Sequence, residues 1–397
     1  MLTEFSRSIT IEQLERDPYA IYKRLRTESP VANVPCANIW FATTWEAAEA
    51  VATNQEKFVA AFEGSPLERS FGAPFILTAD GAVHRELRGT IDPYYRPNKL
   101  IQFFDELCRP IAEETLDALP QSAPVDIMSD YFEMVSAICV GRTLGFRDTD
   151  GPTLTRWFHD LAQGGINYEN DPQRQRICDA ACAEVDAVLV PTLERLRQDP
   201  DNSLLSNMLF AGMAHGEARP IELILPSIKV TMLGGMQEPG HGAGNTLVGL
   251  LQQPEQFQRV AAERGTLLRR ALNEGLRWVG PIGTQVRTAV EDIEVAGTLV
   301  PRGTAIGAVL TSANRDEARF GDPDRFDIFR QERANAAFGF GPHICAGRSF
   351  APMLMELMLD LLLERFPRIE YAAGFTPEFR GWEFRTAPSI VVTLHRS

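Results

Sequence analysis

The sequence predicts a mainly helical α+β protein that folds as a single domain over residues 1–397. Apolar residues recur at the three- and four-residue spacing of amphipathic helices over most of the chain. Alternating, strand-like runs are confined to the first ninety residues, to about residues 284–310 and to the last twenty. No Gly-, Ser- or Pro-rich linker and no internal repeat marks a domain boundary, and a content of 44% hydrophobic residues suffices to enclose a large apolar interior.

The composition argues against two classes of partner. The chain carries 39 Lys and Arg against 53 Asp and Glu, and this net charge of −14 opposes binding to nucleic acid or to an anionic membrane. The N-terminus lacks the basic region and apolar core of a secretion signal, and charge or proline interrupts the most apolar stretches. Six scattered cysteines in such a chain favour reduced thiols, so we expect a cytoplasmic protein.

Two helices are expected in the middle of the chain. The first covers about residues 221–251, and its many glycines, together with Pro239, are expected to kink it or to open its backbone locally. The second covers residues 267–278 and carries Glu274 and Arg277 on one face. Taken alone, these two residues would form an ordinary surface ion pair worth less than about 1 kcal/mol.

A hairpin and a final helix are expected further on. Residues 293–295 and 304–306 alternate in polarity, and the turn residues Pro301–Gly303 between them favour a small hairpin. Residues 350–362 carry apolar side chains at helical spacing, and this helix should end before Pro367.

The strongest chemical signal is the segment Phe338–Gly347, which reads Phe-Gly-Phe-Gly-Pro-His-Ile-Cys-Ala-Gly. Its glycines and proline predict a tight loop whose backbone can approach a flat ligand. A helix that starts just after Cys345 would aim its N-terminal N–H groups at the sulfur and favour a thiolate, and Phe338 and Phe340 would shield that sulfur from water. The alternative interpretation is a small buried hydrophobe in a glycine-rich turn.

This pattern resembles the haem-binding loop of the bacterial cytochromes P-450 at Phe338, Gly341, His343 (where that family more often has Arg), Cys345 and Gly347. Further segments in the same order extend the resemblance from about residue 10 to the C-terminus. It implies the cytochrome P-450 fold, which is a helix-rich triangular prism with small β-sheets. It also implies a haem b cofactor whose iron is bound by Cys345, and monooxygenase activity.

The resemblance implies further residues around the cofactor. Glu274 and Arg277 look like the family's buried Glu-x-x-Arg pair, with a second arginine supplied by the segment Asp322–Phe326. Basic side chains would surround the haem propionates, because cations stabilise a half-buried dianion. The expected cofactor-binding set is His84, Arg88, Gly235, Arg287, Phe338, Gly339, His343, Cys345 and Gly347.

Gln237 and Glu238 stand where most of the family carries an acid followed by threonine, so proton delivery should differ. An amide cannot supply a net proton, whereas a buried carboxyl has a raised pKa and can act as general acid or base. We therefore expect Glu238 to handle protons at the reaction centre and to let hydrogen peroxide replace oxygen and electrons to some degree. The alternative is that Glu238 points away and only caps a break at Pro239.

The run Met236–Gly242 resembles the distal helix of bacterial aryl O-demethylases that act on lignin-derived methoxyphenols such as guaiacol and syringol. This implies O-demethylation of a small aromatic substrate to a catechol-type phenol and formaldehyde. Gly165 predicts room for a second methoxy group, and Gln285 is a candidate hydrogen-bond partner. The expected substrate pocket is lined by Phe71, Phe75, Leu77, Gly165, Ile166, Ile282, Gln285, Val286 and Phe384.

The chain has no room for a flavin or iron–sulfur module beside this pattern, so electrons would come from a separate ferredoxin- or flavin-type reductase. Arg85, Arg109 and Arg348 are candidates for its docking patch. Two alternatives stay open: a monooxygenase that hydroxylates another small hydrophobic substrate, and a haem-binding sensor without turnover.

Overall fold

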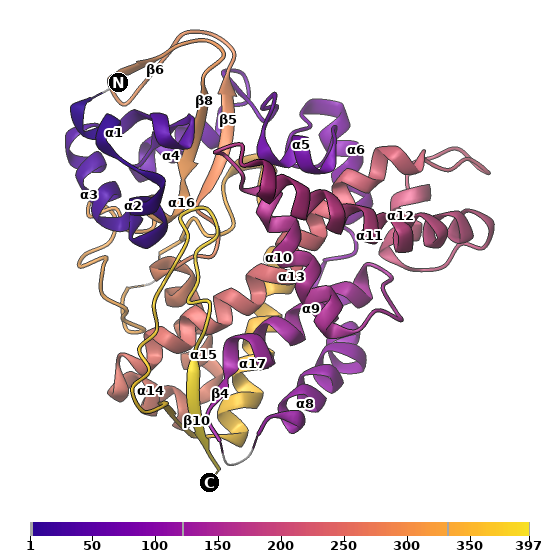
Figure 1. Ribbon diagram of the computed structural model, residues 1–397, viewed down its shortest axis with the longest axis vertical. Helices are drawn as coiled ribbons and strands as arrows, with labels where there is room; N and C mark the ends of the chain where they lie inside the picture. Colours follow the sequence, from indigo (N-terminus) through magenta and orange to yellow (C-terminus); the bar gives the residue numbers. More distant parts are fainter. Residues whose placement is uncertain (1–2, 121–122, 332, 397) are drawn as a thin grey trace.

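The computed structural model describes residues 3–120, 123–331 and 333–396 of a chain that is mainly helical, with three small sheets (Figure 1). The N-terminal helices and the largest sheet lie together at the upper left of that view, while the longer helices fill the rest. The helices are α1 (Glu4–Ser8), α2 (Ile11–Arg16), α3 (Pro18–Glu28), α4 (Trp45–Thr53), α5 (Pro66–Phe71), α6 (Gly81–Ile91), α7 (Pro97–Phe103), α8 (Arg109–Ala118), α9 (Met134–Thr143), α10 (Gly151–Gly165), α11 (Pro172–Gln198), α12 (Leu204–Phe210), α13 (Ile221–Leu251), α14 (Pro254–Ala262), α15 (Arg264–Trp278), α16 (Leu310–Ala313) and α17 (Phe350–Arg365). The strands are β1 (Val31–Val34), β2 (Ile39–Ala42), β3 (Phe58–Val59), β4 (Val125–Asp126), β5 (Thr284–Ala289), β6 (Ile293–Val295), β7 (Thr298–Val300), β8 (Ala305–Val309), β9 (Arg368–Tyr371) and β10 (Val391–His395).

The largest sheet has the strand order β1-β2-β8-β5-β3, with β2 and β8 parallel and the other neighbours antiparallel. A second sheet has the order β4-β10-β9. Strands β4 and β9 lie outside the three regions where strands were expected. Strand β4 is only two residues long, which is too short to show alternation.

The predicted hairpin between residues 293–295 and 304–306 is wrong. Strand β6 pairs with β7 instead, because Ala296 and Gly297 both adopt positive φ values, of 47° and 74°, and close a two-residue turn. The segment 304–306 falls largely in β8, which pairs with β2 and β5.

Helix α13 runs without a break from Ile221 to Leu251, with Pro226 and Pro239 inside it, so the expected opening of its backbone is wrong, whereas a kink stays a prediction. Its glycines instead allow close packing. A Cβ atom on Gly240 would lie 2.8 Å from the carbonyl oxygen of Phe132, and one on Gly249 would lie 2.5 Å from the ring of Phe326. The other two predicted helices, now α15 and α17, are confirmed.

The buried Glu-x-x-Arg pair is present, but its second arginine differs from the prediction. The Glu274 carboxylate accepts hydrogen bonds from Arg277 Nε and Nη2, at 2.7 and 2.8 Å, and from Arg330 Nε at 3.2 Å. Arg325 of the predicted segment has an exposed side chain, and only its backbone carbonyl accepts from the other two arginines. A position five residues along the same loop therefore supplies the second cation.

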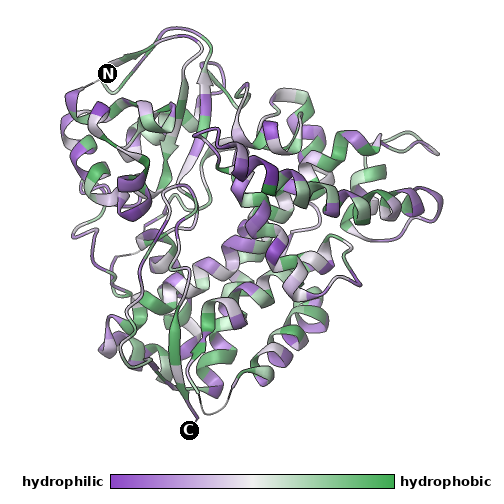
Figure 2. Cartoon of the chain, viewed as in Figure 1, coloured by the Kyte–Doolittle hydropathy of each residue, from purple (hydrophilic) through white to green (hydrophobic). Residues whose placement is uncertain are grey.

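The largest buried cluster of apolar side chains extends from Phe71 to Val392, and two smaller clusters pack around the sheets. Hydrophobic and hydrophilic residues alternate along the outer helices, as amphipathic helices require (Figure 2). Among the described residues, no helix combines the length and the apolar character needed to cross a bilayer.

Candidate active site

A cavity of about 350 Å³ lies between the middle of α13 and the loop that carries Cys345. Cys345, Gly347 and Phe338 contribute to one wall, and Gly234, Gly235 and Glu238 of α13 contribute to another. The sequence predicted both walls.

The cysteine loop is held by its own backbone and by one side chain from β5. Gly339 and Gly341 adopt positive φ values of 73° and 65°, which glycine tolerates best. The backbone N–H of Cys345 donates to the carbonyl of Phe338 at 2.9 Å. Gln285 clamps the loop, because its Oε1 accepts from the N–H of Phe340 at 3.0 Å and its Nε2 donates to the carbonyl of the same residue at 3.2 Å. These bonds occupy much of the amide that we expected to bind substrate.

The thiol of Cys345 faces the cavity and is otherwise enclosed by protein. Burial, followed by the negative charge of Glu238, raises its pKa to about 11, although the N–H of Gly347 and the Arg88 and Arg348 guanidiniums act in the opposite direction. Without a bound metal, the protein groups around the sulfur therefore hold Cys345 as a thiol. The nearest N–H belongs to a short 3₁₀ turn, η5 (Ala346–Arg348), and not to α17. A bound metal cation would deprotonate the thiol itself.

Basic side chains gather at the edge of the same cavity. The rings of His84 and His343 stack with centroids 3.9 Å apart, and His343 Nε2 lies 3.2 Å from Asp80 Oδ1. Arg88 donates to Asp92 and to the carbonyl of Ile344. Within the described part of the chain, His84 Nε2 and Arg287 Nη2 are buried without a hydrogen-bond partner.

These cations are electrostatically unfavourable in the protein alone. Burial, followed by the charges of Arg287 and His84, lowers the pKa of His343 to about 4. Burial likewise lowers the pKa of Arg287 to about 10. An anion with several carboxylate oxygens would satisfy the unpaired donors and offset this repulsion, so the residues present fit the propionates of haem.

Glu238 lines the cavity, so the alternative in which it points away is wrong. Its carboxyl group folds back over its own helix, because a Cβ atom on Gly234 would lie 3.0 Å from Glu238 Oε2. Burial, with no offsetting charge, raises its pKa well above the usual range. Gln237 is buried and does not line the cavity, so of the two expected catalytic residues only Glu238 reaches it.

Every expected substrate-binding residue except Phe71 and Phe75 lines the cavity. Both phenylalanines are buried behind the wall, and Phe71 lies 4.0 Å from the point where a Cβ atom on Gly165 would stand. Gly165 faces Leu233 and Leu67, whose side chains would lie 2.9 and 3.3 Å from such an atom. Flexible apolar side chains therefore fill the space in which a side chain at position 165 would stand.

A polar group of three residues on the cavity wall, Glu383, Thr284 and Tyr168, was not predicted. Glu383 Oε1 accepts from the hydroxyls of Thr284 at 2.8 Å and of Tyr168 at 3.3 Å. Burial raises the pKa of Glu383 to about 8, and its Oε2 has no partner among the described residues. The sequence signal was an acidic residue between Trp382 and Phe384, two large aromatic residues.

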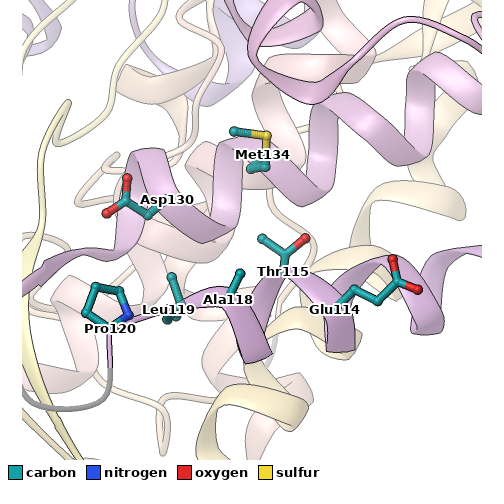
Figure 3. A pocket seen from close by; sticks show the side chains of 7 residues that line it. All are labelled: Glu114, Thr115, Ala118, Leu119, Pro120, Asp130 and Met134. Atoms are coloured by element: carbon teal, nitrogen blue, oxygen red, sulfur yellow. The ribbon is translucent and has the colours of Figure 1, made fainter.

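A second hollow, of about 420 Å³, lies at α8 and the π-helical segment η3 (Met128–Glu133), and Figure 3 shows the side chains around it. It contains none of the predicted site residues. Its lining is Glu114, Thr115, Ala118, Leu119, Pro120, Asp130 and Met134.

The first cavity is lined by a cysteine thiol, by basic side chains of which some nitrogen atoms are unpaired within the described residues, and by an apolar wall, and together these define a haem-thiolate site. The chain belongs to the cytochrome P450 family, because the family model described as "Cytochrome P450" matches residues 37–374. It is a cytochrome P450 monooxygenase, an oxidoreductase with haem b as its cofactor. Members of this family generally use a substrate, O₂ and electrons from a redox partner.

Relatives and solved structures agree with this assignment. The chain is 26% identical over 396 residues to a putative cytochrome P450 133B2 of Xylella fastidiosa, which covers 96% of this chain and 97% of the relative. It is 25% identical to a steroid C26-monooxygenase of Mycolicibacterium smegmatis over 92% of this chain and 90% of the relative. It is also 25% identical to a vitamin D(3) 25-hydroxylase of Pseudonocardia autotrophica, over 90% and 89%.

Among solved structures, CYP109Q5 from Chondromyces apiculatus superposes with a TM-score of 0.85 at 24% identity, covering 100% of this chain and 99% of that one. P450BioI in complex with an acyl carrier protein gives a TM-score of 0.87 at 23% identity, covering 97% and 100%. The predicted fold class is confirmed. None of these relatives is named as an aryl O-demethylase.

Proposed function

We propose that this P450 removes the methyl group from a small methoxyphenol of the guaiacol or syringol type and yields a catechol-type phenol and formaldehyde. The observation that carries the proposal is a mainly apolar cavity whose wall includes the hydrogen-bonded group Glu383, Thr284 and Tyr168, with a separate carboxyl group on α13, Glu238. A methoxyphenol has the complementary chemistry, since its ring is apolar and its hydroxyl needs one hydrogen-bonding group.

Binding would combine burial of the ring with recognition of the hydroxyl. Phe384, Ile282 and Val286 provide apolar contact for a flat ring. Glu383 is mostly protonated at neutral pH because its pKa is raised to about 8, so its carboxyl group can carry a donor hydrogen. Its Oε2 is buried and has no partner among the described residues, so a small rotation of the carboxyl group would present that hydrogen to the phenol oxygen. A wall built to hydrogen-bond a hydroxyl discriminates against an analogue that lacks it.

The position of Gly165 supports a substrate with two methoxy groups. Gly165 lines the cavity and adds no side chain to it, and a second methoxy group would fit there once the flexible side chains of Leu233 and Leu67, which now occupy that space, move aside. We therefore place syringol ahead of guaiacol as the preferred substrate.

Haem, when bound, supplies the oxidising chemistry that hydroxylates the methoxy carbon, and the resulting hemiacetal releases formaldehyde. The protein orients the methoxy group and controls protons. Glu238 provides the proton needed on the α13 side of the cavity, because its raised pKa keeps the carboxyl group protonated. With hydrogen peroxide as oxidant, protonated Glu238 would give its proton to one peroxide oxygen and take a proton back from the other.

Electrons would reach the site from a separate ferredoxin- or flavin-type donor on the cysteine side. Arg85, Arg109 and Arg348 are exposed, and Arg348 donates to the carbonyl of Cys345 at 3.1 Å. Arg109 is already paired with Glu113 at 3.7 Å, which makes it the weakest of the three candidates. Charge reversal at Arg348 should slow reduction without changing substrate affinity, and normal reduction would remove this patch from the proposal.

A second candidate substrate class is favoured by the relatives. A steroid C26-monooxygenase and a vitamin D(3) 25-hydroxylase are both among the similar proteins, so hydroxylation of a larger hydrophobic molecule is the competing function.

Optical titration with syringol, guaiacol, 1,3-dimethoxybenzene and a steroid separates the candidates, because a bound substrate shifts the haem spin state by displacing axial water. We expect the largest shift with syringol, a weaker response with the dimethoxybenzene that lacks a hydroxyl, and formaldehyde release in proportion to electrons consumed. A shift with the steroid and none with either methoxyphenol would overturn the proposal.

A further inference from the structure

A polar cluster connects the protein surface with the side of α13 that does not face the cavity. Glu133, at the end of η3, accepts hydrogen bonds from Nε2 of His241 at 2.8 Å and from Nε2 of His159 at 3.1 Å. Glu133 and His241 are 4% and 2% exposed, whereas the side chain of His159 on α10 is 50% exposed. The three groups therefore form a continuous chain from solvent to α13.

The charge of Glu133 sets the tautomer of both rings. Burial opposes its ionisation, but the two histidines together lower its pKa to about 2, so the carboxylate can only accept hydrogen bonds. Each ring must then donate its Nε2 hydrogen to Glu133. This leaves Nδ1 of His241 free to exchange a proton on its other side.

The ring of His241 lies close to the functional turn of α13. His241 follows Glu238 by three residues and Gln237 by four, and side chains at these spacings are neighbours on a helix. Helical side chains also lean toward the N-terminus, which brings the ring of His241 back over that turn. Within the described residues, His241 Nδ1 and Gln237 Oε1 are both buried without a hydrogen-bond partner. One water molecule between them would satisfy both atoms.

A purely structural cluster does not explain these features. Tying η3 to α13 requires only the bond between Glu133 and His241, and a buried atom without a partner costs about 1–3 kcal/mol. A bond that only holds η3 against α13 would need neither the contact to the exposed His159 nor a buried Nδ1 atom without a partner. Both are useful if protons pass between solvent and the carboxyl group of Glu238.

We propose that His241, held in place by Glu133, returns a proton to Glu238 in each turnover, an inference that rests on the proposed role of Glu238. After Glu238 has given up its proton, doubly protonated His241 donates its Nδ1 proton through water to the Glu238 carboxylate. The Nε2 hydrogen stays on the ring and Glu133 stays ionised. One proton from solvent then restores His241, so one proton leaves, one returns and no electron moves.

The two oxidants distinguish this role from a structural one. Turnover with O₂ consumes two protons from outside along with two electrons, whereas hydrogen peroxide brings both protons with it. In His241→Phe and Glu133→Gln, product formation with O₂ and the electron donor should therefore fall about 100-fold, the lower end of what general acid–base catalysis contributes. Peroxide-driven turnover and the substrate dissociation constant should stay within about twofold of wild type, with all rates normalised to bound haem.

Matched controls and a second readout complete the test. His395→Gln breaks an exposed histidine–glutamate pair of the same length as the His159–Glu133 pair, 3.1 Å, in the second sheet and should change neither route. His159→Gln, a surface change with little risk to folding, should reduce the O₂ route alone. Nitrogen-15 NMR of the histidine-labelled, reduced, carbon monoxide-bound holoenzyme, which is diamagnetic, should find the ring of His241 protonated at Nε2.

Three results would overturn the inference. They are unchanged O₂ turnover in His241→Phe, an equal fall of both routes in Glu133→Gln, and a His241 ring protonated only at Nδ1. Loss of both routes in Glu238→Gln with no response in the histidine variants would leave the proposed function intact and exclude His241 alone.

Discussion

The two sides of the middle of α13 each hold a buried carboxyl group, and their surroundings shift the two pKa values in opposite directions. Glu238 faces the cavity without a charged partner, and burial raises its pKa well above the usual range. Glu133 is as deeply enclosed on the other side, yet two imidazoles lower its pKa to about 2. The charge of a buried carboxyl group therefore depends on its partners more than on its depth. The four carboxyl groups at the core of this protein, Glu274, Glu133, Glu383 and Glu238, should respond to substitution accordingly.

The largest effect should come from Glu274, which has the strongest partners, the guanidiniums of Arg277 and Arg330. Glu274→Ala leaves buried cations unpaired and should reduce the free energy of unfolding by about 3–5 kcal/mol. Glu356→Ala is the matched control, because it removes a largely exposed pair with Arg269 and should cost less than about 1 kcal/mol. Urea unfolding of the haem-loaded proteins measures both, and equal losses would contradict the dependence on buried partners.

Glu133 should give a pH-dependent stability of about 3 kcal/mol, since each pKa unit is worth about 1.4 kcal/mol. Its folded pKa of about 2 lies below the ordinary value of 4.5, so this stabilisation is present above about pH 4.5 and is lost as the pH falls toward 2. Unfolding free energies of wild type and Glu133→Gln should converge as the pH is lowered.

Glu383, with a pKa raised to about 8, should show the opposite sign, so that wild type loses stability relative to Glu383→Gln as pH rises from 4.5 to 8. Parallel pH profiles for all three proteins would refute this.

Glu238→Gln should reduce product formation about 100-fold with either oxidant, because the amide has the same shape and no proton to exchange. The spin-state shift with substrate should survive, since the carboxyl group is not expected to bind the ring. Rapid-quench product analysis measures the first and optical titration the second. Wild-type rates in this variant would exclude Glu238 from the reaction.

The smallest effect is expected at Gly165. An added methyl group would lie 2.9 Å from Leu233 Cδ2, so Gly165→Ala should weaken syringol binding about tenfold relative to guaiacol binding, equivalent to about 1.4 kcal/mol of crowding. Gly164→Ala is the control, because its methyl group would meet Cys178 of α11 outside the cavity and should leave the ratio of the two affinities unchanged. An unchanged ratio in Gly165→Ala would remove this glycine from substrate selection.

The parts of the site that the sequence predicted are those that consecutive residues encode. The cysteine loop and the Glu238 turn each lie within about ten residues, so the resemblance of short segments to a family pattern identified them. The contacts that it missed join distant segments: Glu383 meets Thr284 across 99 positions, and Glu133 meets His241 across 108. The choice between Arg325 and Arg330 likewise depended on the path of a loop, because periodicity does not specify which side chain turns inward.

The bond between Cys345 and the haem iron is tested most directly by reducing the purified protein and adding carbon monoxide. The wild-type protein should show the red-shifted Soret band of a sulfur-ligated haem, and Cys345→Ala should lose that band while it retains haem through the cations at His84, Arg88 and Arg287. A wild-type protein without the band, or an unchanged band in Cys345→Ala, would contradict the account.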